Sequence, residues 1–306
     1  MHNAIDETIE MIGQVLLGKH HQIKLALTCL LSGGHLLIED LPGMGKTTLS
    51  QALAQALGLS FNRIQFTSDL LPADILGVSI YEKDTENFRF YPGPIFNQLV
   101  LADEINRTTP KSQSALLEAM EERQVTIEGE TRPLPQPFFV IATQNPNTQA
   151  GTFPLPESQL DRFLMRIELG YPDAAAEREL LQGEDRRDVL ARLTATMNVR
   201  EFMNLQSQCS QVKVSEALLD YVQRLIQYTR QAPEFAYGLS PRGALAILHC
   251  ARSWALIEHR NHVIPEDVQA VLTAVVEHRL REAADFSGHG GTALAQRLLS
   301  QVDVIG

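Results

Sequence analysis

The chain has 306 residues, of which 44% are hydrophobic and 21% charged, enough for one large or two ordinary domains with a substantial core. Its three cysteines, Cys29, Cys209 and Cys250, lie far apart without metal-ligand spacing, which predicts reduced thiols in a cytoplasmic protein. We expect no membrane span, because no apolar run approaches the roughly 20 residues that one needs. The polar, acidic N-terminus does not have the pattern of a signal sequence.

The net charge is −11, and neither half of the chain is basic. Acidic residues outnumber Lys and Arg by 20 to 12 over residues 1–170 and by 17 to 14 over residues 171–306. This balance argues against broad electrostatic binding to nucleic acid, although it leaves room for a local patch or a pore loop.

The first elements in chain order are two helices. Apolar residues at helical spacing, from Ile5 to Leu16, predict a helix over residues 3–17 that Gly18 ends, and a second helix follows until Gly33. The apolar link around Gly18 could line an adenine pocket or could supply ordinary helix-end contacts to the core. The sequence leaves both interpretations open.

A phosphate-binding pattern comes next. The apolar run 36–38 predicts a buried strand that ends in a Pro/Gly loop, and a helical pattern follows over residues 49–57. Glycines let backbone N–H groups turn toward an anion, and the helix N-terminus adds positive charge. We expect Lys46 to reach the terminal phosphates and the Thr47 hydroxyl to bind Mg²⁺. The candidate nucleotide-binding residues are Pro42, Gly43, Met44, Gly45, Lys46, Thr47 and Thr48, with Gly18 from the preceding link.

The pattern departs from its motif at one position. Gly-x-x-x-x-Gly-Lys-Ser/Thr has glycine where this chain has Asp40, so we expect an altered first turn with the phosphate contacts retained. An ordinary strand–turn–helix corner is the less specific alternative. A dinucleotide-binding fingerprint is disfavoured, because its third glycine is missing.

A hairpin interrupts the pattern that follows. Residues 61–66 alternate as a strand, and residues 78–82 and 87–91 predict two short strands around a polar turn. Insertions of this kind into an α/β core often carry function. A decorated loop without a partner is the alternative.

The second chemical landmark is the buried strand 99–102, which ends in Asp103 and Glu104. In a parallel sheet the carboxyl ends of strands face the ligand crevice. Asp103 is suited to hold Mg²⁺, and Glu104 to orient and deprotonate an attacking water. Such a pair is common at solvated strand ends, but about 57 residues after Lys46 it is a strong signal.

Two further polar residues flank buried strands. A helix over residues 112–123 and a hairpin over 125–131 lead to the strand 138–143, after which Asn145 could place an amide beside the γ-phosphate and its water. Asn-Pro is also ordinary turn chemistry. Arg162 precedes another apolar strand, on a sheet rim where it could reach the nucleotide of a neighbouring subunit.

Beyond residue 171 the hydrophobic period is almost wholly helical. Arg242 stands at a helix start, where a cation is unfavourable unless an anion is near, and a phosphate would supply one. The expected helices cover residues 173–182, 184–195, 199–209, 215–231, 241–258, 265–281 and 291–301.

These motifs together resemble the AAA+ ATPases, specifically the MoxR family. The runs that carry the resemblance are Lys46-Thr47, Asp103-Glu104-Ile105-Asn106-Arg107, Thr143-Gln144-Asn145-Pro146, Leu160-Asp161-Arg162-Phe163 and Leu239-Ser240-Pro241-Arg242-Gly243. The resemblance implies an α/β fold, with a P-loop NTPase αβα core and a parallel five-stranded sheet over residues 1–170. An all-α lid domain would follow over residues 171–306. Residues 70–93 look like the helix-2 insert of that clade, and residues 124–133 like its pre-sensor-1 hairpin.

The resemblance also implies roles and partners. It implies a homo-oligomer, a hexameric ring with nucleotide between subunits. Asn145 would be sensor 1, Arg162 the arginine finger and Arg242 sensor 2, with Arg166 as a second finger candidate. MoxR proteins are similar in partnering von Willebrand factor A domain proteins and in chaperone-like maturation of other proteins.

We therefore expect a cytoplasmic ATPase of the chaperone type, with ATP and Mg²⁺ as cofactors. Two other functions compete with it. A nucleic-acid motor shares the hairpin insertions, but the acidic balance of both halves disfavours it. A nucleotide-gated scaffold with little hydrolysis is disfavoured by the intact Glu104 and Asn145.

Overall fold

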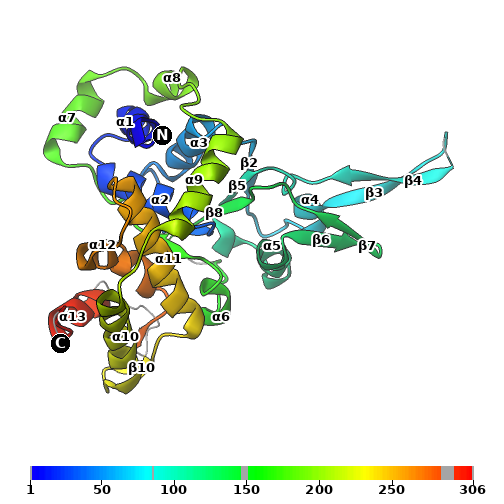
Figure 1. The fold of residues 1–306 in the computed structure, drawn as a ribbon. Helices are drawn as coiled ribbons and strands as arrows, with labels where there is room; N and C mark the ends of the chain where they lie inside the picture. The colour runs from blue at the N-terminus through cyan, green and yellow to red at the C-terminus, as the bar shows by residue number, and fades with distance from the viewer. Residues whose placement is uncertain (1, 85, 146–150, 284–292, 305–306) are drawn as a thin grey trace.

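A five-stranded parallel sheet lies at the centre of the molecule in the computed structural model, which describes residues 2–84, 86–145, 151–283 and 293–304 (Figure 1). All four strand pairs are parallel, as expected for this core. In spatial order the strands are β2 (Phe61–Gln65), β5 (Leu99–Asp103), β8 (Phe139–Gln144), β1 (Leu36–Glu39) and β9 (Met165–Ile167).

The burial of these strands follows from helices on both faces of the sheet. β5 and β8 are buried along their whole length, which is why they read as continuous apolar runs rather than alternating ones. In β1, Leu36 and Ile38 point into one core and Leu37 into the other. β2 is an edge strand, and only its Ile64 is buried.

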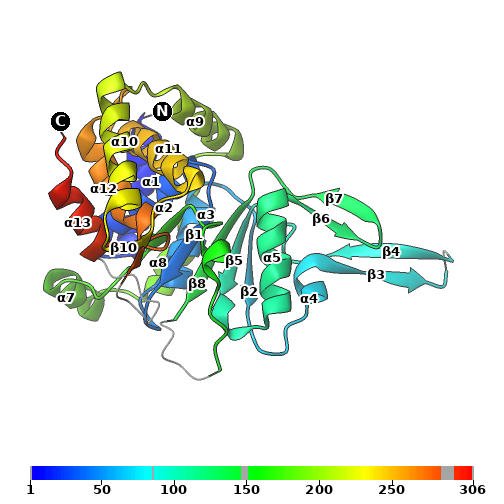
Figure 2. The same cartoon turned by 90° about the horizontal axis from the view of Figure 1, so that it is seen from below.

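The helices divide between the two faces (Figure 2). One face carries α1 (His2–Val15), α2 (His20–Leu31) and α3 (Lys46–Ala56), and the C-terminal helices extend the same core. The other face carries α4 (Pro72–Leu76) and α5 (Pro110–Glu122). The short helix η1 (Ile105–Arg107) follows β5, and the short helix α6 (Glu157–Leu160) precedes β9.

The C-terminal part is helical, as the hydrophobic period predicts. Its helices are α7 (Ala174–Gln182), α8 (Arg186–Ala191), α9 (Val199–Gln211), α10 (Glu216–Gln231), α11 (Pro241–Ile257), α12 (Pro265–Val276) and α13 (Ala293–Gln301). Two expectations were wrong in detail. The helix expected over 184–195 is shorter, and the helix expected to reach residue 281 ends at Val276.

The early end of α12 has a tertiary cause. The next side chains, His278 and Arg279, turn inward to the backbone carbonyl of Phe163 at 2.9 and 2.7 Å. The chain then forms a small antiparallel sheet of β10 (Phe235–Tyr237) and β11 (Arg281–Glu282), which helical periodicity did not predict. These contacts join segments far apart in the sequence, so no local pattern encodes them.

Both expected hairpins are present and project to the same side of the molecule (Figure 1). The first is β3 (Gly77–Glu82) with β4 (Asn87–Pro92), and the second is β6 (Gln124–Ile127) with β7 (Glu130–Pro133). The Arg132 guanidinium lies 4.1 Å from the centre of the Phe90 ring, so the hairpins contact each other. Gly77 is required at the base, because a Cβ there would lie 2.4 Å from the Tyr91 carbonyl oxygen.

A buried carboxyl group lies beside the sheet. Glu277 is 7% exposed and borders a cavity of about 360 Å³ between α2, β9 and α12. Burial raises its pKa to about 7, against the opposing effect of the Arg166 guanidinium. The folded state therefore favours the protonated form, and the stability that this provides is present below pH 4.5 and lost as the pH rises through 7.

Glu277→Gln is therefore expected to raise the free energy of unfolding at pH 8 by on the order of 2 kcal/mol and to change it little at pH 4.5. Urea unfolding of the full chain at both pH values measures this difference. The exposed Glu118→Gln is the matched control and should show no pH-dependent difference. An equal effect of Glu277→Gln at both pH values would contradict the raised pKa.

Candidate nucleotide site

The phosphate loop, residues 40–45, joins β1 to α3. Gly43 and Gly45 have φ values of 84° and 94°, a left-handed conformation that residues with a Cβ rarely adopt. Gly45 is the N-cap of α3, so the positive end of the helix dipole opens onto the loop. The local backbone therefore has the form that an anion-binding loop requires.

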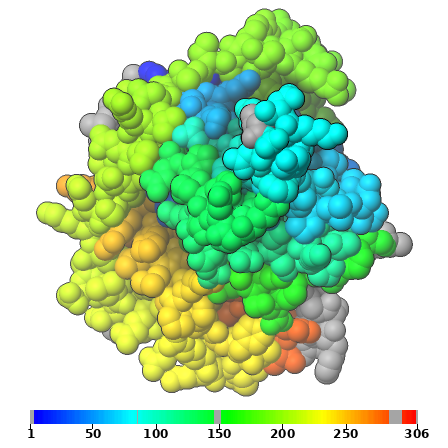
Figure 3. Space-filling view, turned by 90° about the vertical axis from the view of Figure 1, so that its right-hand side faces the viewer, coloured from blue at the N-terminus to red at the C-terminus, as the bar shows by residue number. Residues whose placement is uncertain are grey.

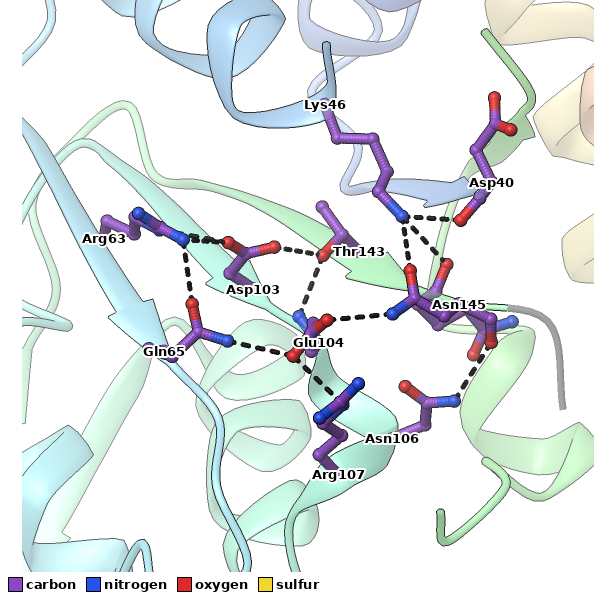
Figure 4. Close-up of polar contacts among 11 residues, drawn as sticks. Asp40, Lys46, Arg63, Gln65, Asp103, Glu104, Asn106, Arg107, Thr143 and Asn145 are labelled. Carbon is purple, nitrogen blue, oxygen red and sulfur yellow. Dashed lines mark hydrogen bonds and ion pairs between the residues drawn. The ribbon is translucent and has the colours of Figure 1, made fainter. Parts of the chain in front are cut away.

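Lys46 connects this loop to two neighbouring strands (Figure 4). Its Nζ donates to the Asp40 carbonyl oxygen at 2.6 Å and to Asn145 Oδ1 at 2.8 Å. Asn145 Nδ2 in turn donates to Glu104 Oε1 at 2.8 Å. Since β1, β5 and β8 are parallel neighbours, their carboxyl ends bring these three side chains together.

The charge around Lys46 is predominantly negative. Burial lowers the pKa of Lys46, while the carboxylates of Asp40, Asp103, Glu104 and Glu39 act in the opposite direction. A polyphosphate placed here would meet these carboxylates as well as the ammonium group. Such a ligand fits the site best when a divalent cation accompanies it.

Asp103 lies at the end of β5, with both carboxylate oxygens in hydrogen bonds. Oδ1 accepts from the Thr143 hydroxyl at 2.6 Å, and Oδ2 accepts from Arg63 Nη2 at 2.6 Å. Thr47 lies in the first turn of α3. A hydroxyl and a carboxylate are the hard oxygen ligands that Mg²⁺ takes alongside phosphates and water, so these residues fit that ion. A cation at Oδ2 would compete with Arg63.

Glu104 has an unusual backbone and a restrained side chain. Its φ of 58° and ψ of 50° are left-handed, a strained conformation for a residue other than glycine that is typical of functional sites. Besides Asn145, its carboxylate contacts Gln65 Nε2 at 3.2 Å and Arg107 Nε at 3.0 Å. Oε2 therefore has two partners and Oε1 has one, so Oε1 keeps a lone pair with which Glu104 can accept a proton from water.

Arg162 lies near the amino ends of the strands, whereas the phosphate loop lies at their carboxyl ends. It precedes β9, and the neighbouring Leu164 N–H donates to the carbonyl oxygen of His35, which precedes β1, at 2.8 Å. The phosphate loop follows the other end of β1. Because β1 and β9 are parallel, Arg162 is kept away from the phosphate loop of its own chain.

Arg242 lies beside Arg162, at the same end of the sheet, because both side chains contact Glu121. Arg162 Nη2 is 3.0 Å from Glu121 Oε2, and Arg242 Nη2 is 2.9 Å from Glu121 Oε1. The anion beside the start of α11 is therefore Glu121 in this structure. Arg166, within β9, lies 3.3 Å from Glu39 and 2.9 Å from Glu168.

Gly18 has a tight structural environment. Its φ is 68°, and a Cβ would lie 2.9 Å from Ala176 Cβ at the start of α7. Leu16 approaches the phosphate loop, with its Cγ 3.9 Å from the Cβ position of Gly45. The segment around Gly18 thus lies beside the phosphate loop. Gly18 itself packs against α7, a structural contact of the kind that the sequence left open beside an adenine pocket.

The contacts of several residues in this constellation were not predicted from the sequence, although Thr143 belongs to a motif named there. Arg63, Gln65 and Thr143 lie on the strands that flank the site, and a search for polar residues near strand ends could have found them. Glu121 carried no signal, because it is an ordinary charged residue on an amphipathic helix. Pro146, in the motif after β8, lies outside the described residues.

Comparison with known proteins identifies both halves of the chain. Residues 35–165 match the model for the ATPase family associated with various cellular activities (AAA), and residues 227–298 match the AAA lid domain. A crystal structure of a candidate ATPase from Cytophaga hutchinsonii superposes with a TM-score of 0.89 at 37% identity, covering 99% of this chain and 95% of that one. The fold and the site define an AAA+ ATPase.

Named relatives narrow the class. The chain is 41% identical to chaperone MoxR1 of Mycobacterium tuberculosis, over 91% of this chain and 76% of that protein. It is 33% identical to protein MoxR of Paracoccus denitrificans, over 87% and 85%. YeaC of Bacillus subtilis is 44% identical, over 99% and 96%. The chain belongs to the MoxR family of AAA+ ATPases.

No helix in the described ranges is both long enough and apolar enough to cross a bilayer.

Proposed function

We propose that the chain is a Mg²⁺-dependent ATPase that acts as a homo-hexameric ring, as in the family it resembles, with each nucleotide between two subunits.

 The observation that carries this proposal is the Lys46–Asn145–Glu104 chain of hydrogen bonds at the ends of three parallel strands. Its supporting observation is the pair of arginines held by Glu121 at the far edge of the sheet.

Each side chain then has a role in hydrolysis. Lys46 and the N–H groups of the phosphate loop bind the β- and γ-phosphates, and Thr47 and Asp103 hold Mg²⁺. The ion, when bound, neutralises charge that develops on the phosphate oxygens. Glu104 accepts a proton from the attacking water, which Asn145 helps to align.

The two arginines complete the site of the next subunit. Arg162 and Arg242 pair with Glu121 near the amino ends of the strands, and the phosphate loop of their own chain lies at the carboxyl ends. Placed against a neighbour, they would exchange this carboxylate for the phosphates of the neighbour's nucleotide. Arg166 is less suited to this role, because Glu39 and Glu168 already flank it within β9.

The work done by hydrolysis is proposed to be chaperone-like remodelling of a client protein. The hairpin β3–β4 stands out from the sheet (Figure 1), and its cyan atoms face the viewer in Figure 3. It exposes apolar side chains. Ile80 is 51% exposed and Phe88 64%. Exposed apolar groups gathered on one projection are suited to contact another protein. A von Willebrand factor A domain partner is supported by the family resemblance.

Lys46→Ala tests the nucleotide site. We expect at least a tenfold loss of affinity for a non-hydrolysable ATP analogue, because a charge-assisted contact to phosphate contributes about 1.5–3 kcal/mol. Equilibrium titration of the full chain with the analogue and Mg²⁺ measures it. Lys24→Ala is the matched control, since Lys24 pairs with Glu258 away from the loop. Unchanged affinity of Lys46→Ala would place the nucleotide elsewhere.

A further inference from the structure

Asp40, which stands where the phosphate-binding motif has glycine, has a carboxylate that binds three backbone N–H groups. Oδ1 accepts from Leu41 N at 2.7 Å, and Oδ2 accepts from Leu169 N at 2.8 Å and Gly170 N at 2.6 Å. The carbonyl oxygen of Asp40 also accepts from Lys46 Nζ at 2.6 Å. One residue therefore joins the phosphate loop to the chain that follows β9.

The chain that follows β9 is continuous with Arg162. Residues 162–170 run from Arg162 through β9 to the two N–H groups from which Asp40 accepts. The neighbour of Asp40 adds a second link, because Glu39 Oε2 lies 3.3 Å from Arg166 Nε in the middle of β9. The short strand is thus attached to the phosphate loop at its carboxyl end and carries Arg162 before its amino end.

The amino end of this segment is held as a unit by Arg279, which is 8% exposed. Its Nε donates to Asp161 Oδ1 at 2.7 Å, and its other nitrogens donate to the carbonyl oxygens of Phe163 at 2.7 Å and Leu164 at 3.0 Å. The residues on both sides of Arg162 are therefore bound to the same side chain, that of Arg279. A displacement at residues 169–170 would move Arg162 with the strand, because a hydrogen-bonded strand does not bend freely.

We propose that Asp40 is a positioning residue that passes the nucleotide state of one phosphate loop through β9 to Arg162, and so to the next site in the ring. The proposal rests on the proposed function, in which Arg162 serves the neighbouring subunit. Glycine at residue 40 would keep the phosphate contacts but leave Leu169 N and Gly170 N without this acceptor. The aspartate that departs from the motif thus links the phosphate loop to the chain after β9.

Hydrogen exchange of the full chain tests the connection. In the wild-type chain, a non-hydrolysable ATP analogue with Mg²⁺ should slow exchange in peptides that cover residues 40–48 and also in peptides that cover residues 161–167. In Asp40→Gly the response of residues 40–48 should remain, because glycine is the residue of the motif, and the response of residues 161–167 should be lost.

Two further variants separate positioning from folding. Asp40→Asn keeps an oxygen that can face residues 169–170, so it should restore the response at residues 161–167. Asp173→Ala removes the N-cap of α7, because Asp173 Oδ1 accepts from Ala176 N at 2.8 Å, and the substitution does not touch the phosphate loop. It should speed exchange at the start of α7 and leave the nucleotide response of residues 161–167 intact.

The outcomes distinguish this proposal from the proposed function. A wild-type chain whose residues 40–48 do not respond to nucleotide overturns the nucleotide site and the connection together. A response at residues 40–48 with none at residues 161–167 overturns the connection alone. So does an Asp40→Gly variant in which residues 161–167 respond as in the wild type.

Discussion

Arg162→Ala is expected to lower the turnover of ATP by about 10³–10⁵-fold while leaving nucleotide affinity within a few-fold of the wild type. The guanidinium is proposed to stabilise charge on the γ-phosphate of the neighbouring subunit only as that charge develops, so its loss acts on turnover rather than on binding. Phosphate release by the assembled ring, measured beside the affinity for an ATP analogue, separates the two effects.

Mixing variants shows whether Arg162 acts between subunits. Rings that combine Arg162→Ala with Lys46→Ala subunits contain interfaces where an intact Lys46 faces an intact Arg162, so part of the turnover should return. Arg166→Ala is the matched control, because Arg166 is already held by Glu39 and Glu168. Near-normal turnover by assembled Arg162→Ala rings, with a large loss in Arg166→Ala, would move the assignment to Arg166.

Glu104→Gln is expected to lower turnover by about 10²–10⁴-fold and to leave ATP bound and unhydrolysed. Glutamine can still accept a hydrogen bond from Asn145 through its amide oxygen, so the geometry of the site should be kept. It cannot accept a proton from water at neutral pH. The measurement is the ratio of ATP to ADP retained by the ring after rapid removal of free nucleotide.

Gln65→Ala provides the control for this experiment. Gln65 Nε2 contacts Glu104 Oε2 at 3.2 Å, so the variant alters the surroundings of the carboxylate without removing it. Its effect on turnover should be far smaller than that of Glu104→Gln. Hydrolysis at the wild-type rate by Glu104→Gln would show that the base lies elsewhere.

Much of the fold was predictable because it is encoded locally. Buried strands appear as short apolar runs, and helices appear as apolar residues at a period of 3.6, so the core, both hairpins and most C-terminal helices could be placed from the chain alone. The errors fall where tertiary contacts override the local pattern. α12 ends early because His278 and Arg279 bind the segment before β9. β10 pairs with β11 although the paired residues Phe235 and Glu282 are far apart in the chain.

The sequence by itself determined which residues gather at the carboxyl edge of the sheet. Lys46, Asp103, Glu104 and Asn145 each follow or end a buried strand, and parallel strands bring such residues together whatever the rest of the chain does. Only the tertiary structure decided which residues meet at the other end of the sheet, where Glu121 pairs with both Arg162 and Arg242. It also decided the place of Asp40, whose partners Leu169 and Gly170 are about 130 residues away. Those contacts depend on how separate elements pack, and spacing along the chain does not record them.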